Sequence, residues 1–273
     1  MASSSKTKNI LVGIDYSKSS TNALHYALML ADRSKSKVTM FHVFEFPLVH
    51  TNSGLYLLNY RDVKKYDLEK MDKIKITAMK DFPNVKIELV NTTENIGSYI
   101  ESEAKKKKID YVVMGLETKS KIAEFIQGTT GVKLSTKINC PVIIVPEKYK
   151  THDLVHAVVT VDNKENIKKR SMDKVDAFAK QHKCNRQILH IKTEDEFLMI
   201  YERKSKTDNK KWGVKSVESK DFLSGLKNYV KNNKVDLAIV FSHSHSMIYN
   251  MFNESNTKAI AFGLNVPVMA IHE

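Results

Sequence analysis

The chain contains two copies of one sequence pattern, and this repeat limits its fold more than any other feature does. Residues 110–147 align without a gap on residues 236–273, and seven of the 38 aligned positions are identical. The identical pairs are Asp110/Asp236, Ser120/Ser246, Ile122/Ile248, Asn139/Asn265, Pro141/Pro267, Val142/Val268 and Glu147/Glu273. Apolar residues recur at matching places as well. Self-similarity of this kind indicates a duplicated structural unit.

The starts of the two copies also correspond. Each copy opens with a β-rich apolar run that ends in an aspartate, Asp15 in the first copy and Asp162 in the second. Asp162 follows Asp15 by 147 residues, whereas Asp236 follows Asp110 by only 126, so the second copy is 21 residues shorter. Because the second strands of the copies still correspond, we expect the loss between the second and third strands.

Strand patterns alternate with helix patterns within each copy. Short continuous apolar runs, such as residues 11–14 and 111–114, are typical of strands that are covered on both faces of a parallel sheet. Ser19 or Ser20 can cap a first helix, and four residues of that helix share one face: Ala23, Ala27, Leu30 and Ala31. Such alternation implies right-handed crossovers, and it predicts an α/β fold with doubly wound parallel sheets.

The repeat predicts two domains, residues 1–148 and residues 154–273, with the polar residues 147–153 as the linker. The last strands of the two copies, 140–145 and 266–271, each begin near a proline, which is tolerated at a sheet edge. These strands can pair edge to edge and join the sheets. We therefore expect an internal pseudo-dimer, and further homodimerisation stays open.

Composition narrows the class of protein. The net charge is +13 and the pI is about 9.4, but the lysines are interleaved with acids along helical patterns, which favours solvated helix faces over a nucleic-acid surface. No apolar run reaches the roughly 20 residues of a membrane span, and no secretory signal pattern precedes the first strand. The two cysteines suggest no disulfide framework. A cytoplasmic protein without membrane contact is expected.

Several features of the first copy should meet at one edge of its sheet. In open α/β sheets, ligands bind beyond the carboxyl ends of the strands. Asp15 ends the first strand, where its carboxylate can accept from a ribose or a base. Val43 and Phe44 end the second strand, where their main chain can meet an adenine. Gly115 ends the fourth strand, and residues 128–130 should open a helix whose amides suit an anion.

These residues resemble those of the universal stress protein family, and the chain is similar to a tandem member over nearly all of both halves. Nucleotide-binding members carry a glycine, two residues, a second glycine, nine residues, and then a glycine followed by serine or threonine. The spacing here runs from Gly115 through Thr118 to Gly128 and Thr129. Thr118 replaces the second glycine, and Glu117 places a negative charge beside it. The resemblance implies a Rossmann-like fold of the adenine nucleotide alpha hydrolase type.

The resemblance also implies a ligand, which would be ATP or a related nucleotide, accompanied by Mg²⁺, in the first domain. Asp15 and the main chain of Val43 would contact the adenosine. The phosphates would lie in the loop formed by Gly115, Thr118, Gly128, Thr129 and Thr130. A stress-response protein that binds a nucleotide and then a protein partner is the function implied.

The second copy lacks these features. Phe241 stands where the first copy has Gly115, and Glu254 stands where it has Gly128. An aromatic ring and a carboxylate at phosphate-facing positions oppose ATP, although Ser255 keeps a hydroxyl. We expect a degenerate site with a structural role.

Other constellations are weaker. His243 and His245 are too few for a metal site. His42 and His190 lie on strands, where buried and hydrogen-bonded imidazoles are expected. An apolar connection at residues 44–60 could act as a lid, as a partner surface or as ordinary packing. No catalytic motif is present, so the alternatives are a nucleotide-free interaction protein with both pockets degenerate and a slow ATP hydrolase.

Overall fold

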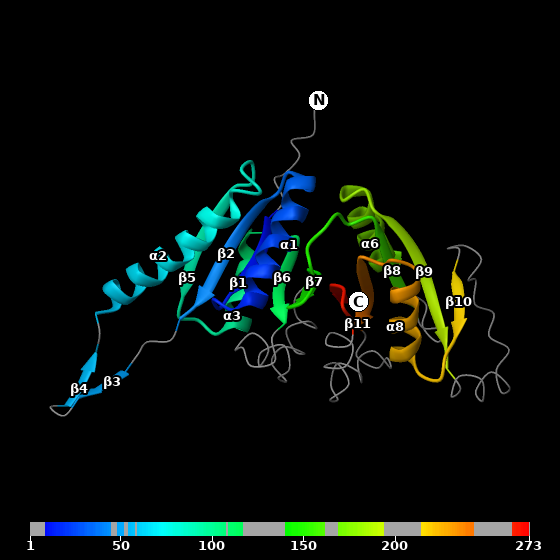
Figure 1. Cartoon of the computed structure of the whole chain (residues 1–273). Coiled ribbons are helices and arrows are strands. Elements are labelled where there is room, and N and C mark those ends of the chain that lie inside the picture. The colour runs from blue at the N-terminus through cyan, green and yellow to red at the C-terminus, as the bar shows by residue number, and fades with distance from the viewer. Residues whose placement is uncertain are drawn as a thin grey trace.

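The computed structural model describes residues 9–44, 48–51, 54–57, 59–107, 109–116, 140–161, 169–193, 214–242 and 264–272. Its main sheet contains β1 (Asn9–Ile14), β2 (Lys37–Val43), β5 (Ile87–Thr92), β6 (Tyr111–Leu116), β7 (Val142–Pro146), β8 (His156–Val161), β9 (Asn185–Lys192), β10 (Lys215–Glu218), β11 (Leu237–Ser242) and β12 (Val268–His272). The helices in these ranges are α1 (Lys18–Ser34), α2 (Tyr60–Ala78), α3 (Ile96–Lys107), α6 (Lys169–Gln181) and α8 (Phe222–Asn232). Figure 1 shows the two halves of the chain side by side along this sheet.

The strand order repeats from one half to the other. Across the sheet it is β10-β9-β8-β11-β12-β7-β6-β1-β2-β5, so each half reads third, second, first, fourth and fifth strand from its outer edge to the middle of the sheet. All neighbours within a half are parallel, and only β12 and β7 pair antiparallel. The prediction of two doubly wound parallel sheets joined as an internal pseudo-dimer is confirmed.

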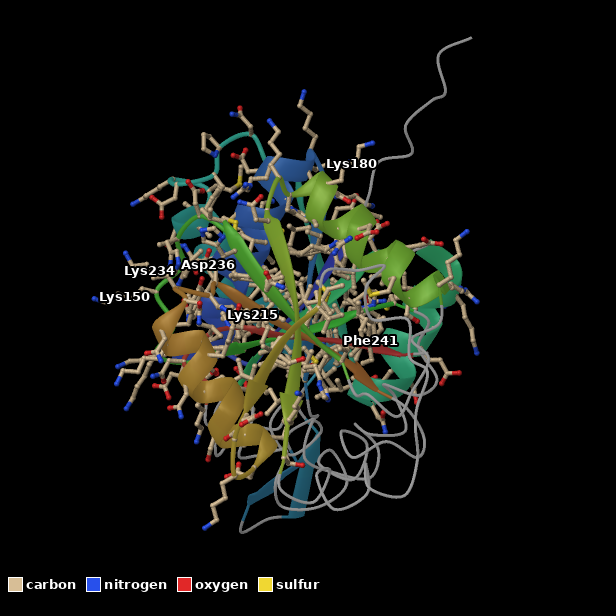
Figure 2. The ribbon with its side chains drawn as sticks, turned by 90° about the vertical axis from the view of Figure 1, so that its right-hand side faces the viewer. Lys150, Lys180, Lys215, Lys234, Asp236 and Phe241 are labelled. Atoms are coloured by element: carbon tan, nitrogen blue, oxygen red, sulfur yellow. The ribbon has the colours of Figure 1, made fainter. Side chains whose placement is uncertain are left out.

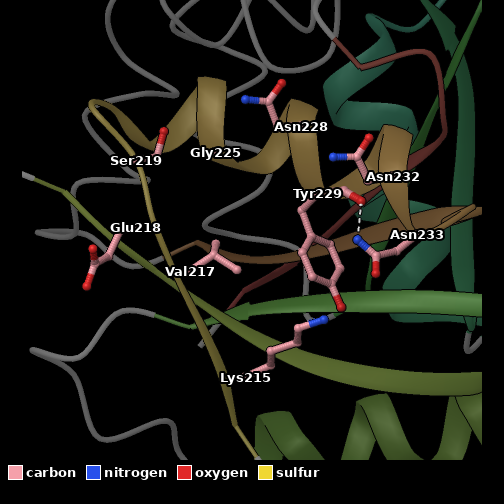
Figure 3. Close-up of a pocket in the computed structure, with 9 residues that line it drawn as sticks. All are labelled: Lys215, Val217, Glu218, Ser219, Gly225, Asn228, Tyr229, Asn232 and Asn233. Carbon is pink, nitrogen blue, oxygen red and sulfur yellow. Dashed lines mark hydrogen bonds between the residues drawn. The ribbon is translucent and has the colours of Figure 1, made fainter.

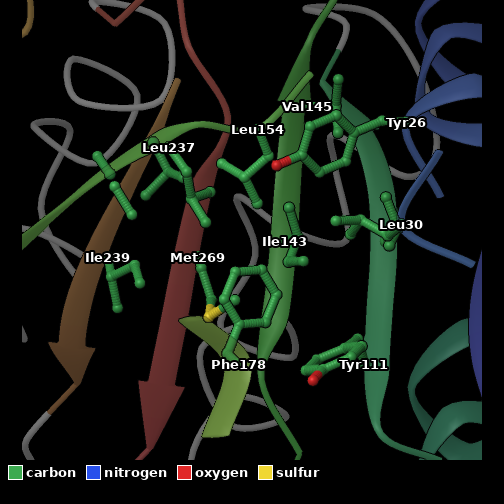
Figure 4. Packing of buried hydrophobic residues seen from close by; sticks show 14 of the residues in the cluster. Tyr26, Leu30, Tyr111, Ile143, Val145, Leu154, Phe178, Leu237, Ile239 and Met269 are labelled. Carbon is green, nitrogen blue, oxygen red and sulfur yellow. The ribbon is translucent and has the colours of Figure 1, made fainter. Parts of the chain in front are cut away.

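The seam between the halves is self-complementary. Ile143 of β7 lies opposite Met269 of β12, and the flanking pairs are Val142 with Ala270 and Ile144 with Val268. The sequence repeat aligns Ile143 with Met269, Val142 with Val268 and Ile144 with Ala270, so each flanking pair is the image of the other. This is the pattern of a two-fold interface. Figure 4 shows Ile143 and Met269 packed with Tyr111 and Phe178, so one core runs through the seam.

An aspartate that both copies share ties the strands of each half together. Asp110 accepts from the amide of Asn9 at 2.8 Å, and its own amide donates to the Asn9 carbonyl at 2.9 Å. Asp236 repeats this arrangement, because it accepts from the amides of Val155 and His156 at 2.8 Å and donates to the His156 carbonyl at 2.8 Å. Each aspartate therefore links the start of a fourth strand to the start of a first strand.

The segment that contains the predicted linker is hydrogen-bonded to helix α1. Asn22 donates to the Pro146 carbonyl at 3.0 Å and to the Tyr149 carbonyl at 2.6 Å. Arg33 donates to the Leu154 carbonyl at 3.0 Å. Tyr149 and Leu154 are buried. The segment between the halves is thus packed against the first half and is not a free polar tether.

The helices cover both faces of the first half. Ile10, Val12 and Ile14 of β1 pack in the same cluster as α1 and as Met71 of α2. Leu11 faces the other way, into a cluster that contains Ile100 of α3. Burial on both faces is the reason that the strands read as continuous apolar runs. None of the helices in the described ranges is long and apolar enough to cross a membrane.

The missing 21 residues fall where the repeat predicts. β2 and β5 are separated by the 43 residues 44–86, whereas β9 and β10 are separated by the 22 residues 193–214. The longer connection holds helix α2 and a small hairpin, β3 (Leu48–Thr51) with β4 (Gly54–Leu57), which Figure 1 shows apart from the main sheet. The apolar connection of the sequence is therefore partly a hairpin. Edge strand β10 instead exposes polar residues at Lys215, Ser216 and Glu218.

The lysines follow the predicted distribution. Figure 2 shows Lys150, Lys180 and Lys234 reaching outward from the ribbon, and all three are exposed. Phe241, by contrast, is only 2% exposed. Along α3, Lys105 pairs with Glu101 at 2.8 Å. The positive charge that the structure describes lies mainly on solvated faces.

Candidate functional site

The sheet of the first half changes direction of winding between β1 and β6. The chain moves from β1 to β2 on one side and returns to β6 on the other, so the carboxyl ends of β1 and β6 flank the crevice in which open α/β sheets hold ligands. Asp15 follows β1, and Gly115 lies near the end of β6. The structure therefore brings these two predicted site residues to one edge.

One carboxylate oxygen of Asp15 accepts hydrogen bonds, and the other receives none from the residues that the structure describes. Its Oδ1 accepts from the Ser17 amide at 3.1 Å and from the Ser17 hydroxyl at 2.5 Å. Its Oδ2 is shielded from solvent and receives no hydrogen bond in the part of the chain that the structure describes. A buried acceptor without a donor costs free energy, of the order of 1–3 kcal/mol. This oxygen is chemically suited to a ligand hydroxyl or amine.

Helix α1 begins earlier than the sequence suggests. Its N-cap is Ser17, whose side chain accepts from the Ser20 amide at 3.1 Å, so the expectation that Ser19 or Ser20 caps the helix is wrong. The turn that Asp15 and Ser17 form fixes the entry of the chain. Ser20 instead accepts from the Asp15 amide at 3.3 Å. The first turn of α1 is therefore bound directly to Asp15.

Gly115 lacks a side chain for a reason that needs no ligand. A Cβ at this position would lie 2.3 Å from the carbonyl carbon and oxygen of Ser19 and 2.6 Å from the Ser20 nitrogen. Contacts below 3.0 Å with backbone are not tolerated, so glycine is required for the first turn of α1 to rest on β6. In the second half the aligned residue is the buried Phe241.

Val43 lies at the end of β2, beside Asp15. Ile14 is paired with His42, so the next residues along the two strands are Asp15 and Val43. The Val43 side chain packs into the cluster on the α3 face. Its main chain is thus placed at the same edge as the free oxygen of Asp15. The remaining predicted phosphate ligands lie outside the described residues: Thr118, Gly128, Thr129 and Thr130.

A buried polar network that the sequence did not suggest adjoins this edge. Asp67, on helix α2, accepts from the hydroxyl of Tyr16 and from the amide of Asn91 at 2.6 Å, and the His42 Nδ1 lies 2.9 Å from its carboxylate. Asp67 is 7% exposed. The network thus joins β2, β5 and the residue after Asp15 to one carboxylate. It confirms the expected hydrogen bond of His42, and His190 is buried as expected.

The network fixes protonation and backbone geometry. Burial, together with the hydrogen bond and the charge of Asp67, raises the pKa of the Tyr16 hydroxyl, which therefore stays a donor. With its proton on Nδ1, His42 would donate to the carboxylate of Asp67, which lies 2.9 Å away. Tyr16 has φ 65°, a left-handed conformation that is uncommon for an aromatic residue. A polar residue four positions before Met71, on an apolar helix stripe, is the signal that could have revealed Asp67.

A described cavity lies elsewhere, at the far edge of the second half. It has a volume of about 210 Å³ and lies between β10 and α8. Figure 3 shows Asn228, Asn232 and Tyr229 of α8 on one side and Lys215 on the other, with the Lys215 ammonium 5.1 Å from the Tyr229 ring centre. Its charged residues, Lys215 and Glu218, have opposite signs, so it offers little attraction to phosphate. This groove is remote from Asp15 in the strand order.

Metal ligands do not cluster in the described ranges. No group of three or more His, Cys, Asp or Glu residues there could hold an ion. His243 and His245 fall outside those ranges, as do Glu254 and Asp162.

Comparison with known proteins agrees with this architecture. The sequence model of the universal stress protein family matches residues 6–146. The universal stress protein YxiE of Bacillus subtilis is 29% identical over 145 residues, which make up 50% of this chain and 97% of that protein.

Solved structures match the chain over almost its whole length. A universal stress protein from Archaeoglobus fulgidus has a TM-score of 0.62 at 14% identity, covering 97% of this chain and 96% of that one. A functionally unknown protein from Pseudomonas aeruginosa has a TM-score of 0.60 at 10% identity, covering 97% and 92%. Likeness at such low identity bears on the fold alone.

The fold and its switch-point edge define a duplicated, doubly wound α/β protein. Because the family model covers more than half of the sequence, the chain belongs to the universal stress protein family.

Proposed function

We propose that the first half of the chain binds an adenine nucleotide, ATP in the first instance, at the carboxyl ends of β1, β2 and β6. The observation that carries this proposal is the buried Oδ2 of Asp15, an acceptor at the switch point with no donor among the described residues. A ribose hydroxyl supplies the missing donor. A hydrogen bond to a charged acceptor contributes about 1.5–3 kcal/mol, which suits a site of modest affinity.

The other predicted contacts follow from this placement. The main chain of Val43 would meet the adenine edge, because it lies beside Asp15 in the register of β1 and β2. Gly115, Thr118, Gly128, Thr129 and Thr130 would hold the phosphates through amides and hydroxyls, with Mg²⁺ on the phosphate oxygens. The residues present fit such a ligand at the Asp15 end.

The second half would not bind a nucleotide. Phe241 fills the position of Gly115 with a buried ring, and it is part of the core beside β12. We assign residues 1–148 and 154–273 to a ligand-binding domain and a structural domain. The protein would act in the stress response, in the cytoplasm, through binding and a protein partner rather than through turnover.

A second candidate is an interaction protein that binds no nucleotide. It is favoured by the packing of Gly115 against Ser19, since that contact accounts for the glycine without a phosphate. Both candidates use the same fold, and they differ only in whether the edge at Asp15 takes a ligand.

Isothermal titration of the full chain with ATP and Mg²⁺ separates the candidates. We expect measurable binding by the wild type and a loss of about tenfold or more in Asp15→Asn, because the hydrogen bond loses its charge. Asp32→Asn is the matched control, since Asp32 is an exposed carboxylate on α1. Gly128→Glu, which copies the second half, should abolish binding while the chain stays folded. No heat from the wild type at millimolar ATP would favour the second candidate.

A further inference from the structure

Asp67 holds three strand ends and one helix together. Its carboxylate accepts from Tyr16 after β1, faces His42 of β2 at 2.9 Å, and accepts from Asn91 of β5 at 2.6 Å. The Tyr16 hydroxyl also lies 3.3 Å from the main-chain oxygen of Asp67. The carboxylate of this one α2 residue therefore contacts side chains from β2, from β5 and from the turn after β1. Loss of this shared acceptor would leave buried donors unpaired, which costs free energy.

Tyr16 is the member that reaches the candidate ligand edge. It follows Asp15 directly, and its φ of 65° sets the turn that carries Asp15 toward Ser17. Its ring lies 4.6 Å from the His42 ring, and the Lys70 ammonium of α2 lies 4.4 Å from the ring centre. A left-handed residue of this size persists only where its surroundings hold it. The groups that contact Tyr16 here are Asp67 and Lys70 of α2 and His42 of β2.

Helix α2 is otherwise lightly attached. Only three of its nineteen residues are buried, namely Asp67, Met71 and Ala78. Three of the four large apolar residues that are exposed in the described ranges also lie on this helix: Tyr60, Tyr66 and Ile76. An element with few buried apolar contacts opens at low free energy. Leu68 and Ile74 also pack against the core from this helix. The Asp67 network thus adds polar contacts to a small apolar contact area between α2 and the sheet.

We propose that Asp67 is a positioning residue for Asp15, and that it couples occupancy of the nucleotide site to the seating of helix α2. The inference rests on the proposed function. Asp67 holds Tyr16 in its left-handed turn, and this turn aims the free oxygen of Asp15. By thermodynamic reciprocity, a ligand that fixes Asp15 must in turn tighten α2. The exposed side of α2, which carries Tyr66 and Ile76, would be the surface that changes with the ligand.

The test compares Asp67→Asn with Glu69→Gln in the full chain. Both changes replace a carboxylate by an amide on α2, but Glu69 is exposed. Without ligand, we expect Asp67→Asn to speed amide hydrogen exchange over residues 14–20 and 60–78, and Glu69→Gln to leave it unchanged. With ATP and Mg²⁺, exchange over 60–78 should slow in the wild type. In Asp67→Asn the ATP dissociation constant should rise about tenfold, a usual size of coupling between sites, and the protection should disappear.

Tyr16→Phe is a second variant for the case that Asp67→Asn does not fold. It removes one hydroxyl and leaves the contacts of Asp67 with His42 and Asn91 in place. It should weaken ATP binding in the same direction by a smaller factor. Unchanged exchange over 14–20 in ligand-free Asp67→Asn would overturn the mechanical link, whatever the ligand. Wild-type affinity and wild-type protection in Asp67→Asn would overturn the coupling. A wild type that shows the link but binds no ATP would instead overturn the proposed function, and the positioning role with it.

Discussion

Gly115→Ala tests the close approach between β6 and α1 that places Asp15. The new Cβ would lie 2.3 Å from two backbone atoms of Ser19, whereas carbon contacts normally lie about 3.5–4.0 Å apart. Strand and helix would have to separate by roughly 1 Å or more. The ten buried residues of α1 would move with the helix, so relief cannot be local. We expect a loss of about 3 kcal/mol in the free energy of unfolding, the upper end for overpacking.

The matched control is Gly225→Ala in α8. Its Cβ would lie 2.7 Å from Ile191 Cγ2 and 2.9 Å from Ser219 Cβ, so this site is also crowded, but by side-chain atoms and not by the main chain of a neighbouring helix. Alanine also gains about 0.8–1.0 kcal/mol of helix propensity over glycine, so the net loss should be smaller than that of Gly115→Ala. Urea unfolding of the two variants and the wild type measures the difference. The reasoning is refuted if Gly115→Ala is as stable as the wild type, or more stable than Gly225→Ala.

Two further predictions concern titrating groups. The ring nitrogens of His152 lie 2.8 Å from Asp236 Oδ1 and from the Lys150 carbonyl, and the hydrogen bond to Asp236 raises the pKa of His152. The stabilisation from this contact is therefore complete below the unfolded pKa of about 6.5, and it is lost as the pH rises through the folded pKa. In thermal melts, His152→Gln should lose up to about 1 kcal/mol of stability at low pH and less at high pH. A loss of stability that grows with pH would contradict this. Burial raises the pKa of Cys140 to about 12 and that of Cys184 to about 11. A thiol reagent at pH 8 should therefore label neither cysteine in the folded chain and both cysteines in urea. Rapid labelling without urea would disprove their burial.

The repeat made most of the architecture predictable. Alternating strand and helix patterns predicted doubly wound parallel sheets, but the order of the strands comes from the structure. The seam at Ile143 and Met269 agrees with the predicted pairing of the last strands of the two copies. The position of the 21 missing residues was also readable, because the aspartates on either side shift by different amounts. These are consequences of local pattern and chain length.

The packing at the site could not be read in this way. Gly115 was interpreted as a phosphate residue, yet its contact with Ser19 joins segments almost a hundred residues apart. The carboxylate of Asp67 contacts Tyr16, His42 and Asn91. The periodicity of α2 can place Asp67 on the buried side of the helix, but it does not identify these partners. The cap of α1 shifted to Ser17 because Asp15 hydrogen-bonds to it. At Gly115 and Asp67 a tertiary contact decided the arrangement, whereas at the α1 cap a local hydrogen bond selected one of three neighbouring serines.

The difference that we propose between the two halves predicts how many nucleotides one chain binds. Titration calorimetry of the full chain with ATP and Mg²⁺ should give a stoichiometry of one nucleotide per chain, because we propose a site in the half with Asp15 and Gly115 and none in the other half. Binding of two nucleotides per chain, or none at millimolar ATP, would contradict the account.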